Sequence, residues 1–387
     1  METPRTFISQ RAHNVDASGI RKVFDLAAKM KNPINLSIGL PDFDVPEIAK
    51  QAAAGAINAG HNRYTQTQGI APLRQRLRAD LSNEFSRDVG EVLITSGVSG
   101  ALLLAILAVV DPGDEVIFLD PYFVMYKHLL TMAGGKSVIV DSYPDFRFDP
   151  DRVEKVITPR TKMLILNSPS NPTGIVMSEP EIRSAVDLAR KHNLLILSDE
   201  IYEPFLYESG KWKVESGETT SSSPLTTLYS PLSLYENTLV VRGFSKSHAM
   251  TGWRVGYAFG PAEVVAQMTK LQQYTFVCAP SPFQEAALAA LDVDMSAHVA
   301  DYRRKRDIAY SMLSAKFEIE KPGGAFYIFP KAPARMTASA FVERAIAANV
   351  LIIPGNVFSE RDTHFRISYA TSDDTLRRGC EILLSLV

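Results

Sequence analysis

Short β-rich runs alternate with longer helical stretches from residue 91 onward, and this alternation constrains the fold more than any other feature. Strands separated by helices pair in parallel through crossover connections, and near-continuous apolar strands are covered on both faces. We therefore predict an α/β fold with a mainly parallel sheet that binds ligands at the carboxyl ends of its strands. The candidate strands are Glu91–Thr95, Glu115–Leu119, Met163–Asn167, Leu194–Ser198, Thr238–Arg242 and Arg254–Phe259.

The pattern changes after about residue 292, where a smaller α+β domain is expected. Its predicted elements are a long charged helix, two strands and a last helix, at Met295–Phe317, Ala325–Phe329, Phe365–Tyr369 and Asp373–Leu386. The first 40 or so residues are too few for a domain and are expected to pack beside it. The predicted division is a large domain at 45–291 and a small domain built from 1–44 and 292–387. The Ser/Thr-rich stretch 215–231 lacks periodicity and is predicted to be a surface loop.

Charge and composition argue against several kinds of partner. The 41 Lys and Arg residues nearly balance the 43 Asp and Glu residues, so the net charge of -2 gives no reason to expect a nucleic acid or an anionic membrane. Cys278 and Cys380 are far apart and have no metal-type spacing, which fits a reducing compartment. The N-terminus has no secretory apolar run, and the most hydrophobic stretch, Ala101–Val110, is about half of the roughly 20 residues that span a bilayer. We expect a cytoplasmic protein that acts on a small molecule without a metal.

The run GFSKSHAMTGWRVG at 243–256 directly follows a predicted strand and carries the strongest chemical signal. A lysine that forms a Schiff base must be neutral to attack an aldehyde, so it needs partial burial and a nearby cation that lower its pKa. Arg254, eight residues after Lys246, could be that cation. Ser245 and Arg254 could also hold a phosphate together. A lysine beside serines is more often an exposed surface residue, and only the whole run favours the functional interpretation.

Polar side chains follow two other candidate strands. Asp199 comes after the apolar strand Leu194–Ser198, and a buried carboxylate there would stabilise a protonated pyridine nitrogen in an electron-sink cofactor. A helix N-cap is an equally good interpretation of Asp199. Tyr202 could reach a hydroxyl on the same ring, and Asn171 in NSPSNPTG could donate its amide to the ring oxygen. Most Asn-Pro turns only turn the chain.

The segment Thr95–Ala101 links a strand to a helix that is expected to begin near Ala101. Gly97 and Gly100 leave backbone amides free to cradle a phosphate, and a helix N-terminus favours an anion. The P-loop lysine motif is absent, so a nucleotide site is not supported.

Two further residues could contact such a cofactor and its substrate. The ring of Tyr122 could stack on a pyridine, and the fork of Arg366 could hold a carboxylate with two parallel hydrogen bonds. Alone, Tyr122 would more often be a core residue and Arg366 part of a surface ion pair.

In this order, the segments resemble fold-type I enzymes that use pyridoxal 5'-phosphate (PLP), specifically the class I and II aminotransferases, which include aspartate and aromatic aminotransferases. The resemblance extends from Ser37–Asp42 to Phe365–Tyr369. It implies a mainly parallel, seven-stranded sheet sandwiched by helices, with a smaller α+β domain. It also implies PLP as cofactor, amino acid and 2-oxo acid substrates, and an obligate homodimer with shared active sites.

The resemblance further implies a role for each residue. Lys246 would form the internal aldimine and, once released by substrate, move a proton between the substrate Cα and C4' of the cofactor, while Asp199 would pair with the pyridine nitrogen. Asn171 and Tyr202 would bond the ring oxygen, and Tyr122 would stack on the ring. The implied phosphate contacts are Val98, Ser99, Gly100, Ser245, Arg254 and, from the neighbouring subunit, Tyr64. The implied contacts of the substrate α-carboxylate are Arg366, Asn171 and the amide of Gly39.

Two departures from the family pattern, at Gly243 and at Val98–Gly100, bear on the predicted site. Gly243 stands where many relatives have serine, so one phosphate hydroxyl would be missing. The segment Val98–Gly100 lacks a lysine that some acid-selective relatives carry, which argues against strict aspartate specificity. Phe326 and Tyr327 are expected near the pocket and would suit a neutral or aromatic side chain, although core packing is as good an interpretation.

Three functions are compatible with these residues. The first is an aminotransferase for aromatic, neutral or a broad range of L-amino acids, with aspartate as a further candidate donor and a 2-oxo acid such as 2-oxoglutarate as acceptor. The second is a PLP-dependent carbon-sulfur β-lyase on the same scaffold. The third is a ligand sensor like those of some transcriptional regulators, which the expected lack of room for a DNA-binding module before Ser37 disfavours. The sequence leaves the identity of the amino donor open.

Overall fold

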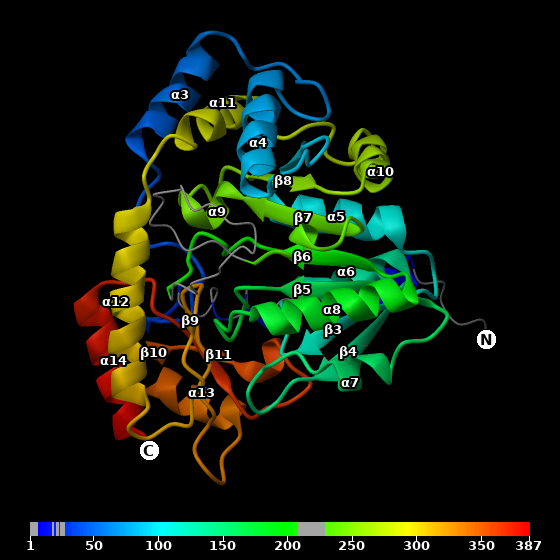
Figure 1. Cartoon of the computed structure of the whole chain (residues 1–387). Helices are drawn as coiled ribbons and strands as arrows, with labels where there is room; N and C mark the ends of the chain where they lie inside the picture. The colour runs from blue at the N-terminus through cyan, green and yellow to red at the C-terminus, as the bar shows by residue number, and fades with distance from the viewer. Residues whose placement is uncertain (1–6, 18, 21–22, 24–27, 208–228) are drawn as a thin grey trace, which may run out of the picture.

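A seven-stranded sheet forms the centre of the computed structural model, which describes residues 7–17, 19–20, 23, 28–207 and 229–387 (Figure 1). The strand order is β2-β8-β7-β6-β5-β3-β4, and the bounds are β2 Leu93–Ser96, β3 Glu115–Asp120, β4 Lys136–Asp141, β5 Thr161–Asn167, β6 Leu195–Asp199, β7 Thr238–Gly243 and β8 Val255–Phe259. Neighbouring strands pair in parallel except β8, which runs antiparallel to both β7 and β2. The predicted α/β fold with a mainly parallel sheet is confirmed.

Each of the six predicted strands overlaps a strand of this sheet, but β4 was not among them. β4 lies at the edge of the sheet and pairs there with β3. It begins and ends on exposed charged residues, Lys136 and Asp141, and most of the residues between them are only half-buried. An edge strand is covered less completely than a central one, so its apolar run is short and gives a weak sequence signal.

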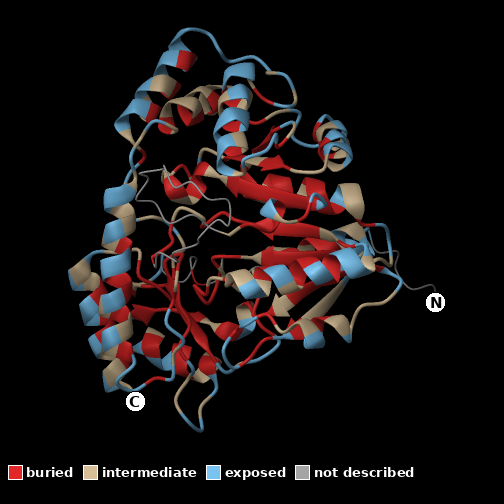
Figure 2. Ribbon diagram, viewed as in Figure 1, coloured by how far each residue is buried: buried red, intermediate tan, exposed pale blue. Residues whose placement is uncertain are grey.

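Helices cover both faces of the sheet, whose strands are largely buried (Figure 2). α5 (Gly97–Val109), α6 (Met125–Ala133) and α10 (Ala262–Gln272) lie on one face, and α7 (Pro150–Glu154) and α8 (Glu179–His192) lie on the other. α8 begins with a capping box, in which Ser178 and Glu181 satisfy free amides of its first turn. α5 begins at Gly97 rather than near Ala101, so the predicted phosphate cradle is the first turn of the helix itself.

The C-terminal part carries helices α12 (Ser296–Leu313), α13 (Ala338–Ala347) and α14 (Asp373–Ser385) and a small antiparallel sheet of order β11-β12-β9. Its strands are β9 Tyr327–Ile328, β11 Ile353–Pro354 and β12 Phe365–Ser368. β1 (Ile34–Asn35) pairs in parallel with β10 (Val350–Leu351), which brings the N-terminal segment beside this part. We propose that 45–291 and 1–44 with 292–387 are the two domains, and this pairing supports the proposal.

The remaining described elements are α1 Gln10–His13, α3 Glu47–Asn58, α4 Ala71–Glu84, α9 Phe244–Ser247, α11 Ser281–Ala290, η1 Pro231–Ser233 and η2 Gly355–Val357. α3, α4 and α11 pack together at one end of the central sheet. Most of the predicted Ser/Thr-rich loop, residues 215–228, lies outside the described residues. Within the described part, the helices are too short or too polar to cross a bilayer.

Candidate active site

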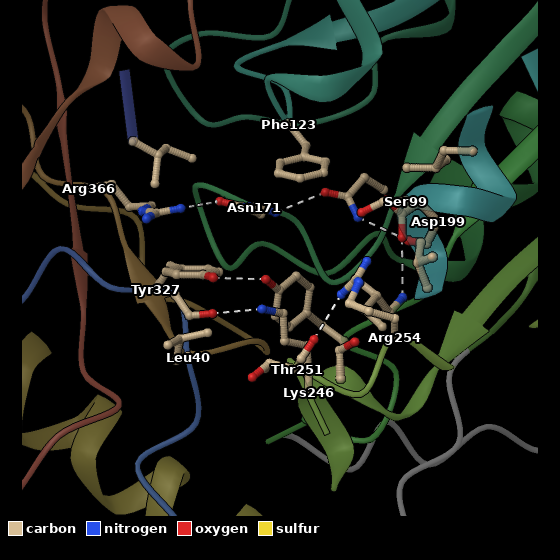
Figure 3. A pocket seen from close by; sticks show the side chains of 18 residues that line it. Leu40, Ser99, Phe123, Asn171, Asp199, Lys246, Thr251, Arg254, Tyr327 and Arg366 are labelled. Atoms are coloured by element: carbon tan, nitrogen blue, oxygen red, sulfur yellow. Dashed lines mark hydrogen bonds between the residues drawn. The ribbon is translucent and has the colours of Figure 1, made fainter. Parts of the chain in front are cut away.

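A cavity of about 330 Å³ lies where β5, β6 and β7 end (Figure 3). Predicted site residues that line it are Gly39, Val98, Ser99, Asn171, Asp199, Tyr202, Ser245, Lys246, Arg254 and Arg366. The other lining residues are Ile20, Leu40, Leu102, Phe123, Asn167, Ile201, Thr251 and Tyr327. Residues from distant parts of the chain therefore meet at the edge of the sheet where an α/β fold binds its ligands.

Lys246 enters the cavity from α9, the short helix that follows β7. Its Nζ donates a hydrogen bond to the carbonyl oxygen of Gly39 at 2.7 Å. Burial lowers the pKa of Lys246 to about 8, and the positive charges of Arg366 and Arg254 add to this effect. An amine with this pKa is neutral in a useful fraction of molecules near neutral pH, as a nucleophilic lysine must be.

The backbone around α9 explains why residue 243 is glycine. A Cβ atom on Gly243 would lie 2.9 Å from the Cα atom of Gly256 and 3.2 Å from a methyl group of Val98. A serine at this position would therefore clash with the neighbouring strand in this backbone.

Asp199 is the last residue of β6, and its carboxylate is buried at the cavity wall. The hydroxyl of Tyr126 donates to Oδ2 at 2.6 Å, and the amide of Ile201 donates to Oδ1 at 3.3 Å. Burial raises the pKa of Asp199 to about 6, and the hydrogen bond from Tyr126 opposes this rise. The turn after Asp199 is not an α-helix, so the N-cap interpretation is wrong. A buried acid of this kind is suited to pairing with a cation.

The first turn of α5 and Arg254 form one wall of the cavity. Gly97 has a φ of 67°, and a Cβ there would lie 2.5 Å from the Arg254 guanidinium. Glycine at this position therefore lets the guanidinium approach the helix N-terminus. Ser96, the N-cap residue, makes no side-chain hydrogen bond to the helix amides. Because the hydroxyls of Ser99 and Ser245 also line the cavity, this wall can hold a phosphate.

Arg366 lies on the opposite side of the cavity from Arg254 (Figure 3). It is 1% exposed, and its guanidinium is sandwiched between the rings of Tyr327 and Phe358 at 4.4 and 4.6 Å from their centres. One terminal nitrogen donates to Oδ1 of Asn171 and the other to the carbonyl of Ser37, each at 2.9 Å. Its buried Nε has no hydrogen-bond partner among the described residues. A guanidinium stays protonated even when burial lowers its pKa, so it can receive a carboxylate.

Tyr202 and Tyr327 form a buried pair beside Arg366. Their hydroxyl oxygens are 2.8 Å apart. Tyr327, from β9, was expected only near the pocket, but it lines the cavity, whereas Phe326 does not. Phe326 instead packs edge-on against the ring of Tyr202, with ring centres 5.4 Å apart.

The structure corrects the prediction for Tyr122. Its ring lies outside the cavity and packs against Phe118, and its hydroxyl donates to Glu360 at 2.9 Å. The next residue, Phe123, lines the cavity instead. The amide of Tyr122 donates to the carbonyl of Phe358 at 2.7 Å, and this contact fixes the segment so that the following side chain faces inward.

Two other predicted contacts lie away from the cavity. Gly100 lies within α5 and is not a lining residue. Tyr64 also lies outside the cavity of its own chain, with 83% of the residue exposed. Its role at a neighbouring subunit stays a prediction.

Among the residues that the sequence analysis missed, Tyr126 and Asn167 hold predicted site residues in place. Tyr126, which holds Asp199, is four residues after Tyr122 in the segment PYFVMY, and only this aromatic spacing could have indicated it. Asn167 is the last residue of β5, and its Nδ2 donates to the carbonyl of Asp199 at 3.0 Å while its Oδ1 accepts from the amide of Asn171 at 2.9 Å. A polar residue at a strand end was a signal for Asn167 that the prediction did not use.

Comparison with known proteins identifies the family. The family model for aminotransferase class I and II matches residues 31–383. The chain belongs to the class I and II aminotransferases. It is 35% identical to a probable aspartate aminotransferase of Methanocaldococcus jannaschii, over 97% of this chain and 98% of that protein. It is 38% identical to the aspartate/prephenate aminotransferase of Thermus thermophilus, over 93% and 92% of the two chains.

A solved structure agrees with these relatives. The aspartate aminotransferase from Thermus thermophilus with maleate is 34% identical and superimposes with a TM-score of 0.88, covering 99% of this chain and 100% of that one. The reaction class of this aminotransferase is PLP-dependent transamination. The comparisons give no support to the alternative of a carbon-sulfur lyase.

Members of this family use PLP, and the cavity of this aminotransferase fits that cofactor. Lys246 is a partly buried amine with a lowered pKa. Gly97 leaves the space that Arg254 occupies beside free helix amides, which suits a phosphate. Asp199 is a buried carboxylate without a cationic hydrogen-bond partner among the described residues, which suits a protonated ring nitrogen.

Proposed function

We propose that this aminotransferase moves the amino group of an L-amino acid with a neutral or aromatic side chain to a 2-oxo acid such as 2-oxoglutarate. The charge of the cavity wall carries this proposal. Lys246, Arg254 and Arg366 are the cations among the described lining residues, and the cofactor and the substrate α-carboxylate require all three. Ile20 and Leu40 add apolar surface to the cavity.

The names of relatives are compatible with this range of donors. One relative, 35% identical over 97% of this chain, is named aromatic-amino-acid aminotransferase 2 of Thermococcus litoralis. Others are named for aspartate or for aspartate and prephenate. The apolar wall and the missing lysine at Val98–Gly100 favour the neutral and aromatic donors.

When bound, PLP supplies an electron sink for the negative charge that develops at the substrate Cα. In our proposal, Lys246 holds the cofactor covalently and, once released, moves the proton at that carbon. Asp199, held by Tyr126, keeps a positive charge at the ring nitrogen. Tyr202 and Asn171 donate to the ring oxygen.

The rest of the wall fixes the position of the cofactor. The ring of Phe123 takes the stacking role that the sequence assigned to Tyr122. The amides near Val98 and Ser99, the Ser245 hydroxyl and the Arg254 guanidinium bind the phosphate. Because these contacts hold the cofactor, it would stay in the cavity after its bond to Lys246 is broken.

Arg366 binds the substrate α-carboxylate in this proposal. Its Nε and a second hydrogen on a terminal nitrogen are available for two parallel hydrogen bonds. Asn171 presents its carbonyl oxygen to Arg366, so its NH₂ group remains to donate to the substrate or the cofactor. The carbonyl of Gly39 already accepts from Lys246, so the amide is the part of Gly39 that would face a carboxylate.

We also propose a homodimer in the cytoplasm. Tyr64 and Tyr274 are 83% and 86% exposed, so both rings are available to a second copy of the chain. A second copy would bring Tyr64 to the phosphate of its neighbour, and sedimentation of the PLP-loaded protein at the mass of two chains would agree with this.

Two free cysteines support a reducing compartment.

A panel of amino acids tests the proposed donor preference. The PLP-loaded protein is mixed with one amino acid at a time, and the change in cofactor absorbance that accompanies amino transfer is followed. Phenylalanine, tyrosine and leucine should react roughly 10 to 100 times faster than aspartate. A distal carboxylate that faces an apolar wall loses its hydrogen bonds to water, which costs about 1–3 kcal/mol of binding free energy. Aspartate as the fastest donor would contradict the preference, and no reaction with any amino acid would contradict transamination itself.

The lowered pKa of Lys246 predicts how cofactor capture depends on pH. Only the neutral amine attacks an aldehyde, and the amine is neutral above its pKa. The rate at which cofactor-free protein captures PLP should therefore rise with pH through a midpoint near the pKa of Lys246, about 8, and level off above it. Absorbance after rapid mixing measures this rate. Arg366→Gln should move the midpoint upward, because it removes a positive charge, whereas a rise that continues to the ordinary lysine pKa would show that burial does not act on Lys246.

A further inference from the structure

Tyr327 touches three parts of the active site at once (Figure 3). Its hydroxyl lies 2.8 Å from the hydroxyl of Tyr202, and its ring lies 4.4 Å from the Arg366 guanidinium. The same hydroxyl would be 2.3 Å from a Cβ on Gly39, so it packs closely against the segment whose carbonyl accepts from Lys246. Tyr327 is 1% exposed, and these contacts leave its ring little freedom to move.

The two hydroxyls share one hydrogen bond, and either oxygen could be its donor. A phenol has one proton to donate, so Tyr202 cannot donate both to Tyr327 and to the cofactor. In the proposed function, Tyr202 donates to the ring oxygen. Tyr327 must then donate to Tyr202.

Both phenols are able to act as donors near neutral pH. Burial raises the pKa of Tyr327 and of Tyr202 above the ordinary value for tyrosine, so both hydroxyls keep their protons. In a chain of hydrogen bonds, each donor polarises the next. A hydroxyl that accepts from Tyr327 is therefore a stronger donor than one that accepts from nothing.

We propose that Tyr327 is a positioning residue: it donates to Tyr202, so that the Tyr202 hydroxyl donates only to the ring oxygen of PLP. Tyr327 thereby lowers the pH at which the bound cofactor loses its proton. The inference rests on the proposed role of Tyr202. The same residue also sets the plane of the Arg366 guanidinium through its ring. Tyr327 thus connects the group that binds the cofactor oxygen with the group that binds the substrate carboxylate.

A titration of cofactor absorbance against pH, without substrate, tests the hydroxyl of Tyr327. Tyr327→Phe should raise the midpoint by roughly 0.5 to 1 pH unit, the size expected for one lost hydrogen bond in the chain. Tyr202→Phe should raise it further. The double variant should match Tyr202→Phe, because Tyr327 acts through Tyr202. An unchanged midpoint in Tyr327→Phe, or additive shifts in the double variant, would overturn the inference.

A matched tyrosine separates this role from packing. Tyr369 is also fully buried, and its hydroxyl donates to the carbonyl of Ala325 at 3.1 Å rather than to a group that lines the cavity. Tyr369→Phe should leave the titration midpoint unchanged. A shift as large as that of Tyr327→Phe would mean that loss of any buried hydroxyl moves the midpoint, and the inference would fail.

Steady-state kinetics separate the hydroxyl of Tyr327 from its ring. Tyr327→Phe keeps the ring over Arg366, so kcat should fall several-fold while KM stays within about twofold. Tyr327→Leu removes the ring, and KM should rise at least about tenfold for every donor. The reverse pattern would assign Tyr327 to substrate binding alone and overturn the inference.

The titration also distinguishes this inference from the proposed function. It uses no substrate, so an error in the donor preference would not affect it. If Tyr202→Phe fails to move the midpoint, the proposed role of Tyr202 and the inference both fail. If Tyr202→Phe moves the midpoint but Tyr327→Phe does not, only the inference fails.

Discussion

Replacing Lys246 with alanine should lower turnover at least about 10³-fold, since the variant loses both the covalent link to the cofactor and the group that moves the proton at the substrate Cα. The phosphate wall around Arg254 is untouched, so the variant should still bind PLP. Its cofactor absorbance should be that of free PLP rather than of the lysine-bound form. Turnover with the best donor and the spectrum after removal of unbound PLP measure the two effects.

Lys331 provides a matched control for this experiment. It is a surface lysine that pairs with Glu318 at 2.8 Å, and its side chain is 46% exposed. Lys331→Ala should keep the wild-type spectrum and turnover. Normal turnover in Lys246→Ala, with the control also normal, would refute the assignment of Lys246.

Replacing Arg366 with glutamine should lower kcat/KM by roughly 10²- to 10⁴-fold for every amino acid donor. Two charge-assisted hydrogen bonds to the α-carboxylate would be lost, each worth about 1.5–3 kcal/mol. The kcat/KM of Arg366→Lys should lie between those of the wild type and Arg366→Gln. Lysine keeps the charge but loses the planar fork that lies between the rings of Tyr327 and Phe358. Initial rates over a range of donor concentrations give these values.

The choice of donor shows which carboxylate Arg366 binds. A primary amine without an α-carboxylate should react slowly with the wild type, and Arg366→Gln should react with it at nearly the same rate. Arg378, which is exposed and pairs with Asp374, is a suitable control, and Arg378→Gln should behave as the wild type. A loss confined to acidic donors would mean that Arg366 binds a distal carboxylate.

The sequence predicted the residues whose positions follow from strand ends. Asp199 is the last residue of β6 and Lys246 follows β7, so parallel pairing brings them to one edge of the sheet. Gly97 and Ser99 follow β2, which runs in the same direction as β7 because both are antiparallel to β8. The sequence also predicted the helices α12 and α14 to within a few residues. Apolar periodicity and local turns encode these features.

Features that depend on contacts between distant segments could not be predicted in the same way. The orientation of Tyr122 is fixed by hydrogen bonds to Phe358 and Glu360, more than 230 residues away, and this turns Phe123 inward. The sequence predicted a strand at Ala325–Phe329, but not that Tyr327 rather than Phe326 lines the cavity, because the pairing of β9 with β12 decides which side chain faces inward. A one-residue shift in an extended segment reverses which side chain faces the site.

The pairing of β1 with β10 has a consequence for synthesis of the protein on the ribosome. Ile34 and Leu36 are translated more than 300 residues before Val350–Leu351, the strand that they pair with. The strands of the central sheet, at 93–259, are all available earlier. The cofactor wall can therefore assemble while translation continues, whereas the carbonyl of Ser37 can meet Arg366 only after residue 366 has been translated. Until Val350–Leu351 is translated, Ile34 and Leu36 remain without the strand that they pair with in the folded protein.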